Sequence, residues 1–302
     1  MNTIVNRHGR SIKQQGAGFT LVELAIAITI IGLLFVLFLP VSSTLLNNKK
    51  RELSRQKLNI IETAMANYVA INKRLPCPAD GTLSTGLEVS RNASQDCTGS
   101  QVNGVVPWVT IGLTKADIED GWHHRITYRA GFGLTRDNAL DMSWCDPAGT
   151  KSVDMDAGTP PVGICSPSCV GINMATCTST QNYLASKGFD IRDGTGTTLI
   201  MSGTPPAYTG AAYVLISHGD NGYGAFSSEG TYIATAAPGV NGIIEAFNLA
   251  TVSVASGVPT TANTFRDADF SEGTAATQFD DILIRPSVFS VIQRAQIGPR
   301  SH

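Results

Sequence analysis

Charge is scarce in this chain and neither sign prevails: 15% of its 302 residues are charged and the formal net charge is −2. Proteins that bind nucleic acids usually carry a basic patch, and a balance so close to neutral gives no electrostatic footprint of that kind. Two hydrolase motifs are also missing, the Gly-x-Ser-x-Gly elbow and the His-Glu-x-x-His zinc pair. We therefore predict that the protein is not an enzyme and that nucleic acid is not its main partner.

Three histidines, His123, His124 and His218, are the candidates for pairing with a serine or a cysteine. Neighbouring residues on a strand point to opposite faces, so His123 and His124 cannot serve one site together if they lie on a strand. We interpret all three as surface or turn residues, because the sequence shows no catalytic constellation around them.

Long hydrophobic runs are missing with one exception, residues 24–39, which contain no charged side chain. The string GFTLVE at 18–23 stands directly before this run and places Glu23 beside it. An acid inside a membrane helix costs ~2.5–3.5 kcal/mol on insertion scales, so it is rarely kept without a partner. A cut between Gly18 and Phe19 would create a cationic amine that Glu23 of a neighbouring copy could neutralise. We predict that this segment is an assembly device as well as an anchor.

The string at 18–23 resembles the cleavage and methylation motif of the type IV pilin superfamily, which comprises type IV pilins and type II secretion pseudopilins. The resemblance implies that a prepilin peptidase removes the leader, residues 1–18, by cutting after Gly18. It further implies that the same enzyme methylates the new amine of Phe19, and that Glu23 is the assembly carboxylate. Other pilin or pseudopilin subunits are then the main partners.

Gly32 and Pro40 also match the family, whose filaments lose helicity between these two positions. The missing amide proton of Pro40 and the conformational freedom of Gly32 agree with such a loss. Residues 19–46 as a helix would be about 42 Å long, against a hydrocarbon core of ~30 Å. We therefore expect this hydrophobic helix to be transmembrane before assembly.

Two other interpretations of the N-terminus are an ordinary secretory signal cut near 41–43 and a plain signal anchor. Neither explains the string at 18–23. The leader carries three basic and no acidic residues, which favours a cytoplasmic position, but a second basic cluster at 49–57 leaves the orientation undecided by charge. The resemblance implies a single pass through the inner membrane, with the head in the periplasm or outside the cell, and incorporation into a filament after assembly.

Residues 47–75 continue the helical pattern as an amphipathic second half, with a charged outer face. We expect this half to end near Leu75, because Pro76 and Pro78 bar continuation. The predicted buried stripe consists of apolar residues spaced three, four or seven apart. It comprises Leu53, Ile60, Ile61, Ala64, Tyr68 and Ile71.

The remainder, residues 76–302, predicts an α+β head in which an antiparallel sheet packs on the second half of the helix. Short strands are expected between turn residues, at 105–111, 125–130, 212–217, 231–235, 243–247 and 281–285. Residues 137–204 form an irregular, loop-rich insertion in this prediction. A short helix is expected at 287–297.

Six cysteines lie on the side predicted to be exported, at Cys77, Cys97, Cys145, Cys165, Cys169 and Cys177. An even number outside the cytosol favours disulfides, although six cysteines allow about 15 connectivities. Our working pairing joins Cys77 to Cys97 and lets the other four staple the insertion among themselves. The rival hypothesis is a zinc site formed by those four, which lack paired Cys-x-x-Cys spacing.

Three further strings resemble a subgroup of pseudopilin-like proteins: LPCPA at 75–79, DGW at 120–122 and FDDIL at 279–283. The second departs from the major pseudopilin pattern because His123 stands where that pattern has glycine. The head is also larger than that of the major subunit. The resemblance therefore implies a minor subunit.

Residues 217–224, SHGDNGYG, resemble the calcium-binding loop of several pseudopilins. Calcium takes six to eight oxygen ligands, which Asp220 and Asn221 could supply together with Asp280 or Asp281 from another segment. An Asp-Asn-Gly sequence is also a favoured β-turn, so a turn without metal is the alternative. No cofactor is certain, and structural calcium is the one candidate.

Two functional hypotheses remain. The first is a structural assembly subunit of a type IV pilus or a type II secretion filament. The second is a binding module, in which the same anchor displays a head that captures a surface, DNA or an exported substrate. They differ in whether the head has a specific ligand.

Overall fold

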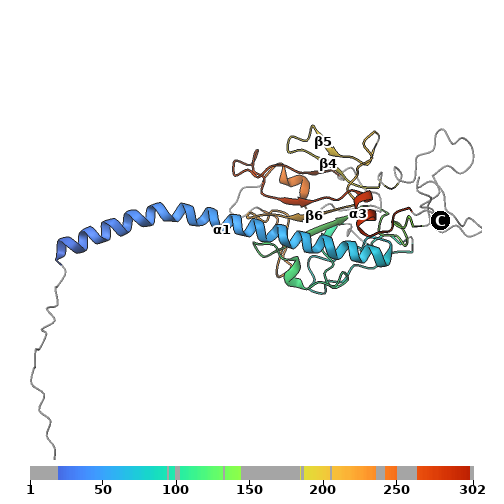
Figure 1. Cartoon of the computed structure of the whole chain (residues 1–302), viewed down its shortest axis with the longest axis horizontal. Coiled ribbons are helices and arrows are strands. Elements are labelled where there is room, and N and C mark those ends of the chain that lie inside the picture. The colour runs from blue at the N-terminus through green and yellow to red at the C-terminus, as the bar shows by residue number, and fades with distance from the viewer. Residues whose placement is uncertain are drawn as a thin grey trace, which may run out of the picture. The chain divides into compact units, whose positions relative to one another are not determined.

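A computed structural model describes residues 20–93, 95–98, 103–131, 133–143, 184, 187–204, 206–235, 242–249 and 264–299, and the side chains of 35–43 lie outside this description. The chain divides into two units, Met1–Asn47 and Asn48–His302. Each unit is described by itself below. Figure 1 shows the whole chain.

Helix α1 covers Leu21–Asn72 and crosses the boundary between the two units. It ends three residues earlier than expected, at a C-terminal turn in which Lys73 has a left-handed φ of 58° and its amide donates to the carbonyl of Val69 at 2.8 Å. A left-handed residue just after the last turn is a common way to end a helix. Pro76 and Pro78 follow at once, as the sequence suggested.

The buried stripe of α1 differs in part from the predicted one. Ile61 and Tyr68 are buried as expected, but Leu53, Ile60 and Ile71 are 43%, 44% and 79% exposed. The fully buried positions are Ser54, Leu58, Ile61, Met65 and Val69. Apolar spacing alone misplaced the stripe because one of its members is polar: the Ser54 hydroxyl donates to the Lys50 carbonyl and accepts the amide of Gly121, both at 2.9 Å.

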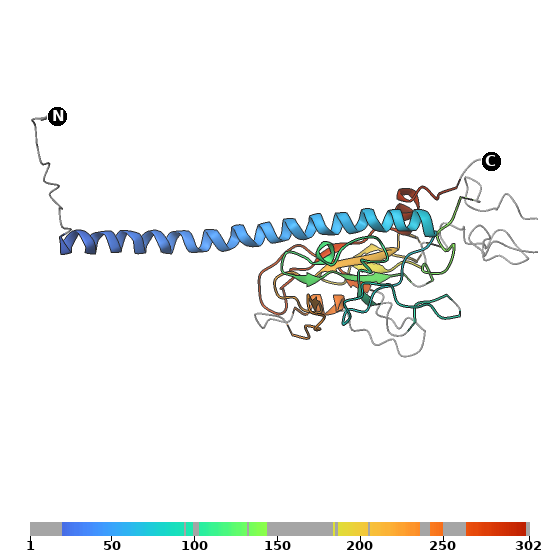
Figure 2. The same ribbon diagram turned by 90° about the horizontal axis from the view of Figure 1, so that it is seen from below.

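The main sheet has four strands in the order β1-β3-β6-β9, all antiparallel. These strands are β1 (Asn103–Val105), β3 (Thr127–Ala130), β6 (Tyr213–Ser217) and β9 (Ile282–Ile284). The C-terminal half of α1 lies along one face of this sheet (Figure 2). The α+β architecture with a helix on an antiparallel sheet is therefore confirmed.

Strand β6 is buried along its whole length because both of its faces are covered. Tyr213 and Leu215 belong to the core shared with α1, whereas Val214 and Ile216 belong to a second core with Ile191. This alternation follows from the two-residue period of a strand. A central strand covered on both sides is a nearly continuous apolar run, as the sequence around β6 is.

The second core lies under a three-stranded sheet of order β5-β4-β8, formed by β4 (Asp190–Arg192), β5 (Leu199–Met201) and β8 (Thr264–Arg266). Strands β4 and β5 fall inside the segment that was expected to be an irregular insertion, and β4 pairs with β8 in parallel. Each of these strands has only three residues, and β8, the second partner of β4, is distant in sequence, so little local pattern marks them.

Four of the expected strands need correction. Residues 243–247 are not a strand, because the 3₁₀ helix η3 occupies Glu245–Asn248. Residues 106–112 leave the sheet after β1 and form turns, and Tyr232 makes only an isolated bridge to Phe226. The segment predicted at 125–130 is split into β2 (His124–Arg125) and β3, with β2 paired to β7 (Phe226–Ser227).

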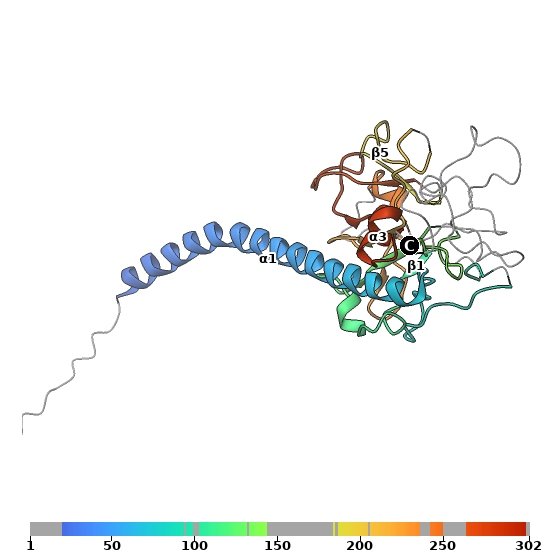
Figure 3. The ribbon, with the colours of Figure 1, turned by 45° about the vertical axis from the view of Figure 1, so that its right-hand side comes forward.

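The expected C-terminal helix is present but shorter, as α3 (Val288–Arg294), which is labelled in Figure 3. Its N-cap is Ser287, whose hydroxyl accepts the Ser290 amide at 3.2 Å. Arg294 forms an ion pair with Glu62 of α1. A second short helix, η1 (Lys115–Ile118), begins with a capping box between Thr114 and Asp117.

Candidate functional site

The cleavage residues Gly18 and Phe19 lie outside the described residues, and the description begins at Thr20. The Thr20 amide and hydroxyl both donate to the Glu23 carboxylate at 3.0 Å, and the Glu23 amide donates to the Thr20 hydroxyl at 3.2 Å. This reciprocal arrangement is a capping box, which satisfies amide donors at the start of a helix. Glu23 therefore has a local role in the single chain that our sequence reasoning missed, although the Thr-x-x-Glu spacing signals it.

The first turns of α1 expose apolar side chains without a partner in the single chain. Those of Leu21, Val22 and Leu33 are 85%, 66% and 65% exposed. A Cβ added at Gly32 would meet no atom within 4 Å, and the helix runs unbroken through Gly32 and Pro40. Contiguous exposed apolar surface marks an interaction site. The loss of helicity between Gly32 and Pro40 concerns the filament and stays a prediction.

We expected residues 19–46 to cross a membrane. Across the residues that the structure describes, no helix combines the length and the apolar character needed for that crossing.

The turn at 120–123 joins the head to α1. A Cβ at Gly121 would lie 2.3 Å from the Lys50 carbonyl oxygen, so only glycine allows this close approach. His123, which stands where the major pseudopilin pattern has glycine, has a left-handed φ of 66°. This is a backbone conformation that glycine adopts more readily than histidine.

Three acidic side chains meet in the head: Glu245 of η3, and Asp280 and Asp281 just before β9. One oxygen of each lies within 4.8 Å of the others, and all three side chains are buried. The Asp280 amide donates to Glu245 Oε1 at 2.7 Å, and the Asn248 side chain donates to Asp281 Oδ2 at 2.8 Å. This group is called the acidic cluster from here on.

Burial disfavours the charged form of all three acids in the acidic cluster. Burial, reinforced by Asp281 and Glu245, raises the pKa of Asp280 to about 8, and burial raises the pKa of Asp281 to about 7. Burial and the neighbouring Asp281 also raise the pKa of Glu245. Asp280 Oδ1 is buried with no hydrogen-bond donor among the described residues, and Asp281 Oδ1 is buried 3.3 Å from Nδ1 of His218. Buried carboxylates in this state either keep a proton or bind a cation.

The oxygen separations in the acidic cluster leave room for a calcium ion. Calcium–oxygen distances of ~2.4 Å place ligands on opposite sides of the ion about 4.8 Å apart. The only ligand types in the cluster are carboxylate oxygens, which are the hard donors that this ion prefers. Gln278 Oε1, two residues before Asp280, is a further buried acceptor without a donor in the described part of the chain.

The four residues that the sequence suggested as calcium ligands separate into two pairs. Asp280 and Asp281 belong to the acidic cluster. Asp220 is exposed and contributes its backbone amide, which donates to Asp280 Oδ2 at 2.9 Å. The Asn221 side-chain amide donates to Glu245 Oε2 at 2.8 Å, so the loop at 217–224 braces the acids. Sequence reasoning missed Glu245, because it lies in a segment that was predicted to be a strand.

Position 219 in this loop requires a glycine. It has a left-handed φ of 61°, and a Cβ there would lie 2.4 Å from the side-chain carbon Cγ of Asp280. The backbone of the loop therefore packs closely against the Asp280 side chain, and a turn without a bound partner would not need this contact.

His218 lies in the interior, contrary to our interpretation of it as a surface or turn residue. Its Nε2 is 3.0 Å from Thr127 Oγ1, and its Nδ1 is 3.3 Å from Asp281 Oδ1. Burial lowers the pKa of His218 to about 4, with Arg129 acting in the same direction. Hydroxyl, imidazole and carboxylate follow one another as in a nucleophilic triad, but Thr127 and His218 have no exposed surface, so no substrate reaches them. This arrangement is a packed polar core.

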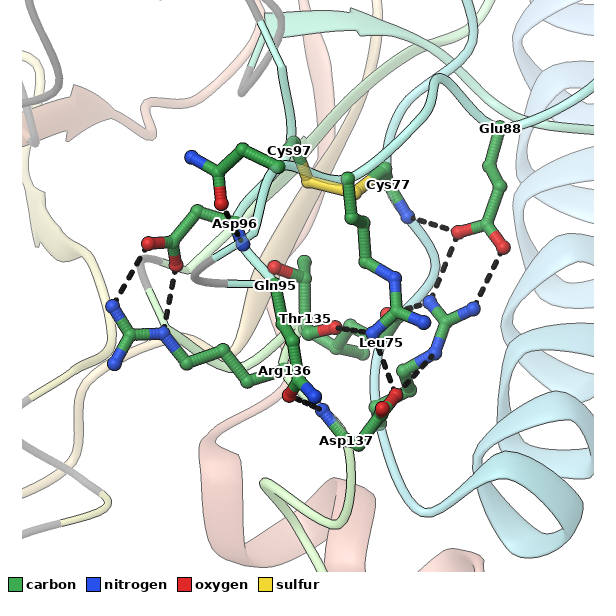
Figure 4. Close-up of polar contacts among 12 residues, drawn as sticks. Leu75, Cys77, Glu88, Gln95, Asp96, Cys97, Thr135, Arg136 and Asp137 are labelled. Atoms are coloured by element: carbon green, nitrogen blue, oxygen red, sulfur yellow. Dashed lines mark hydrogen bonds and ion pairs between the residues drawn. A yellow bond between two sulfur atoms is a disulfide. The ribbon is translucent and has the colours of Figure 1, made fainter.

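The predicted disulfide between Cys77 and Cys97 is present and closes a loop just after α1 (Figure 4). Ion pairs hold the same loop. Arg74 forms two hydrogen bonds with the Glu88 carboxylate at 2.7 and 2.9 Å. Arg136 binds Asp96 twice, at 2.8 Å.

The other four cysteines, Cys145, Cys165, Cys169 and Cys177, lie outside the described residues. Their disulfides and the rival zinc site stay predictions.

Comparison with known proteins concerns the N-terminus alone. Residues 14–39 match the family model described as the prokaryotic N-terminal methylation motif, which is the leader signature of type IV pilins and pseudopilins. This motif implies membrane-associated assembly into a filament, with other pilin subunits and prepilin peptidase as partners, and it favours a structural subunit over an enzyme. No curated protein and no solved structure matches the chain.

Proposed function

We propose that this chain, which carries the methylation motif, is a minor pilin or pseudopilin of a type IV pilus or a type II secretion filament. Prepilin peptidase cuts between Gly18 and Phe19 and methylates Phe19, and the subunit passes from the inner membrane into the filament through its N-terminal helix. The motif at 14–39 carries this proposal. The exposed apolar side chains of residues 21–34 support it, since a neighbouring helix would cover them.

The role of Glu23 decides how assembly works, because the carboxylate can cap its own helix or neutralise a neighbour's amine. Three variants separate these roles. Glu23→Gln keeps a side chain that serves in a capping box but loses the charge. Thr20→Ala removes the cap and keeps the charge, and Glu23→Ala removes both.

We expect all three variants to lose their leader, and only Thr20→Ala to enter filaments at near wild-type levels. Immunoblots of sheared filaments and of membranes measure entry, and intact-mass analysis finds whether the mature chain starts at methylated Phe19. If Glu23→Gln assembles normally while Thr20→Ala does not, Glu23 acts as a cap and charge pairing is wrong. A mature chain starting after residue 43 would refute the proposal as a whole.

We also propose that the head holds a structural calcium ion through Glu245, Asp280 and Asp281. The meeting of three buried carboxyl groups, with Asp280 Oδ1 left without a donor among the described residues, carries this second proposal. Calorimetric titration of the purified chain with CaCl₂ should show one site, and Glu245→Gln with Asp281→Asn should abolish it. Asp269→Asn, an exposed acid outside the acidic cluster, is the matched control and should bind normally. Absence of binding to the wild type would refute the calcium site and leave the filament role untouched.

The alternative function is a filament-displayed binding module. An open pocket of about 920 Å³ favours it, with Ile243, Phe247, Arg266 and Asp267 among its lining residues. The Phe247 ring is 49% exposed and has the Arg266 guanidinium 4.2 Å from its centroid. Phe247→Ala with normal filaments but lost attachment or DNA uptake would favour this function. Normal attachment and uptake with lost secretion in a deletion strain would favour the structural role.

A further inference from the structure

The acidic cluster lies next to the part of α1 with which the helix enters the head. The link is the segment 267–281. Ser271 and Phe279 pair through two backbone hydrogen bonds of 2.9 and 3.0 Å, which close a loop between them. Phe270 therefore stands at one foot of this loop and Asp280 at the other.

Arg51 of α1 contacts both feet. Its guanidinium lies 3.9 Å from the centroid of the Phe270 ring, and its NH1 donates to the Asp280 carbonyl at 3.5 Å. A guanidinium over an aromatic face is an attractive contact. Arg51 thus joins the helix to the residue whose carboxylate is part of the acidic cluster.

A second connection runs through Ser54. Its hydroxyl accepts the Gly121 amide, and the preceding Asp120 accepts the Ser217 hydroxyl at 2.7 Å. Ser217 begins the loop whose amides, from Asp220 and Asn221, donate to Asp280 Oδ2 at 2.9 and 3.1 Å. The contacts of Arg51 and of Ser54 therefore both connect α1 to Asp280.

We propose that a cation bound in the acidic cluster fixes residues 50–54 of α1 on the head, so that cation occupancy sets how far the helix stays docked. This inference rests on the proposed calcium site. An ion drawing the three carboxylates together fixes the positions of Asp280 and of the loop at 217–224. Arg51 and Ser54 then meet a fixed surface. Without the ion, nothing draws the three carboxyl groups together, so the same surface loosens and the first docked turn of α1 frays.

Coupling between two sites is reciprocal, so a change that frees the helix must lower the affinity of the acidic cluster for the ion by the same factor. Arg51→Ala tests this, and Phe270→Leu is a second variant that keeps apolar bulk while removing the ring. Arg55→Ala is the matched control, since Arg55 is an exposed arginine one turn further along α1. Near-UV circular dichroism verifies that each variant keeps a packed head.

The experiment combines calorimetric CaCl₂ titration of the full chain in detergent with amide hydrogen exchange of residues 48–58, in CaCl₂ and in EGTA. We expect calcium to slow exchange there roughly 5–10-fold in the wild type and in Arg55→Ala. Arg51→Ala and Phe270→Leu should lose that protection and bind calcium more weakly by a similar factor. Calcium binding with unchanged exchange in the wild type would overturn the inference and leave the calcium site standing. No calcium binding at all would refute both.

Discussion

The Cys77–Cys97 disulfide is the one cross-link in the described part of the chain, and its contribution follows from the loop that it closes. The two cysteines are 20 residues apart. In the chain-entropy treatment, closing a loop of that length in the unfolded state is worth about 3 kcal/mol at room temperature. Cys77→Ala combined with Cys97→Ala removes this constraint without placing a hydroxyl at the fully buried position 77.

The ion pairs around the loop do not offset this loss. Arg74–Glu88 and Arg136–Asp96 hold the loop in the native state, but they leave the unfolded chain unconstrained. For a domain of ~150–250 residues, each kcal/mol lowers Tm by ~2–4 °C. We therefore expect the double variant to melt about 6–12 °C below the wild type.

Circular dichroism melts of oxidised wild type and double variant, in matched buffers, measure this difference. Arg136→Gln is the control, because its pair with Asp96 is partly exposed and contributes at most about 1 kcal/mol. A double variant that melts within about 2 °C of the wild type, or no lower than Arg136→Gln, would refute the loop-entropy reasoning.

Three further predictions concern the head. In EGTA, Tm should fall between pH 6.5 and 8.5, because Asp280 and Asp281, with pKa values of about 8 and 7, keep protons in the native state that the unfolded state has already lost. The fall is at most ~1.4 kcal/mol per pH unit for each proton retained, and a flat profile would contradict the assignment. His218, with a pKa of about 4 in the native state against an ordinary 6.5, adds only a small opposing rise at the lower edge of this window. Gly121→Ala should cost roughly 2–3 kcal/mol in urea unfolding, because its Cβ would meet the Lys50 carbonyl at 2.3 Å, and an unchanged midpoint would show that the turn can move away from α1. His123→Gly should stabilise the protein by less than about 1 kcal/mol, because glycine relieves the strain of the left-handed φ of 66° but also raises the entropy of the unfolded chain. A clear loss of stability in the same assay would mean that the imidazole makes a contact worth more than the strain.

The two candidate sites differ in how much of each could be predicted from the sequence. The string at 18–23 pointed to the methylation motif that residues 14–39 match, because this motif consists of consecutive residues. The acidic cluster was only half visible, since Asp280 and Asp281 are adjacent in sequence but Glu245 reaches them from η3, 35 residues away. The fold brings these carboxylates together, and nothing near Glu245 in the sequence indicates it.

The sequence by itself determined the long helix, the α+β class and the processing motif, because each depends on local spacing or on prolines. It left the cysteine pairing open, and the structure selected Cys77–Cys97. Only the tertiary structure decided which face of α1 is buried, where a polar Ser54 takes a core position by bonding Gly121. It also decided that His218 is interior and that β4 joins β8 through long-range pairing. These features depend on partners far away in the chain, and a local pattern cannot carry that information.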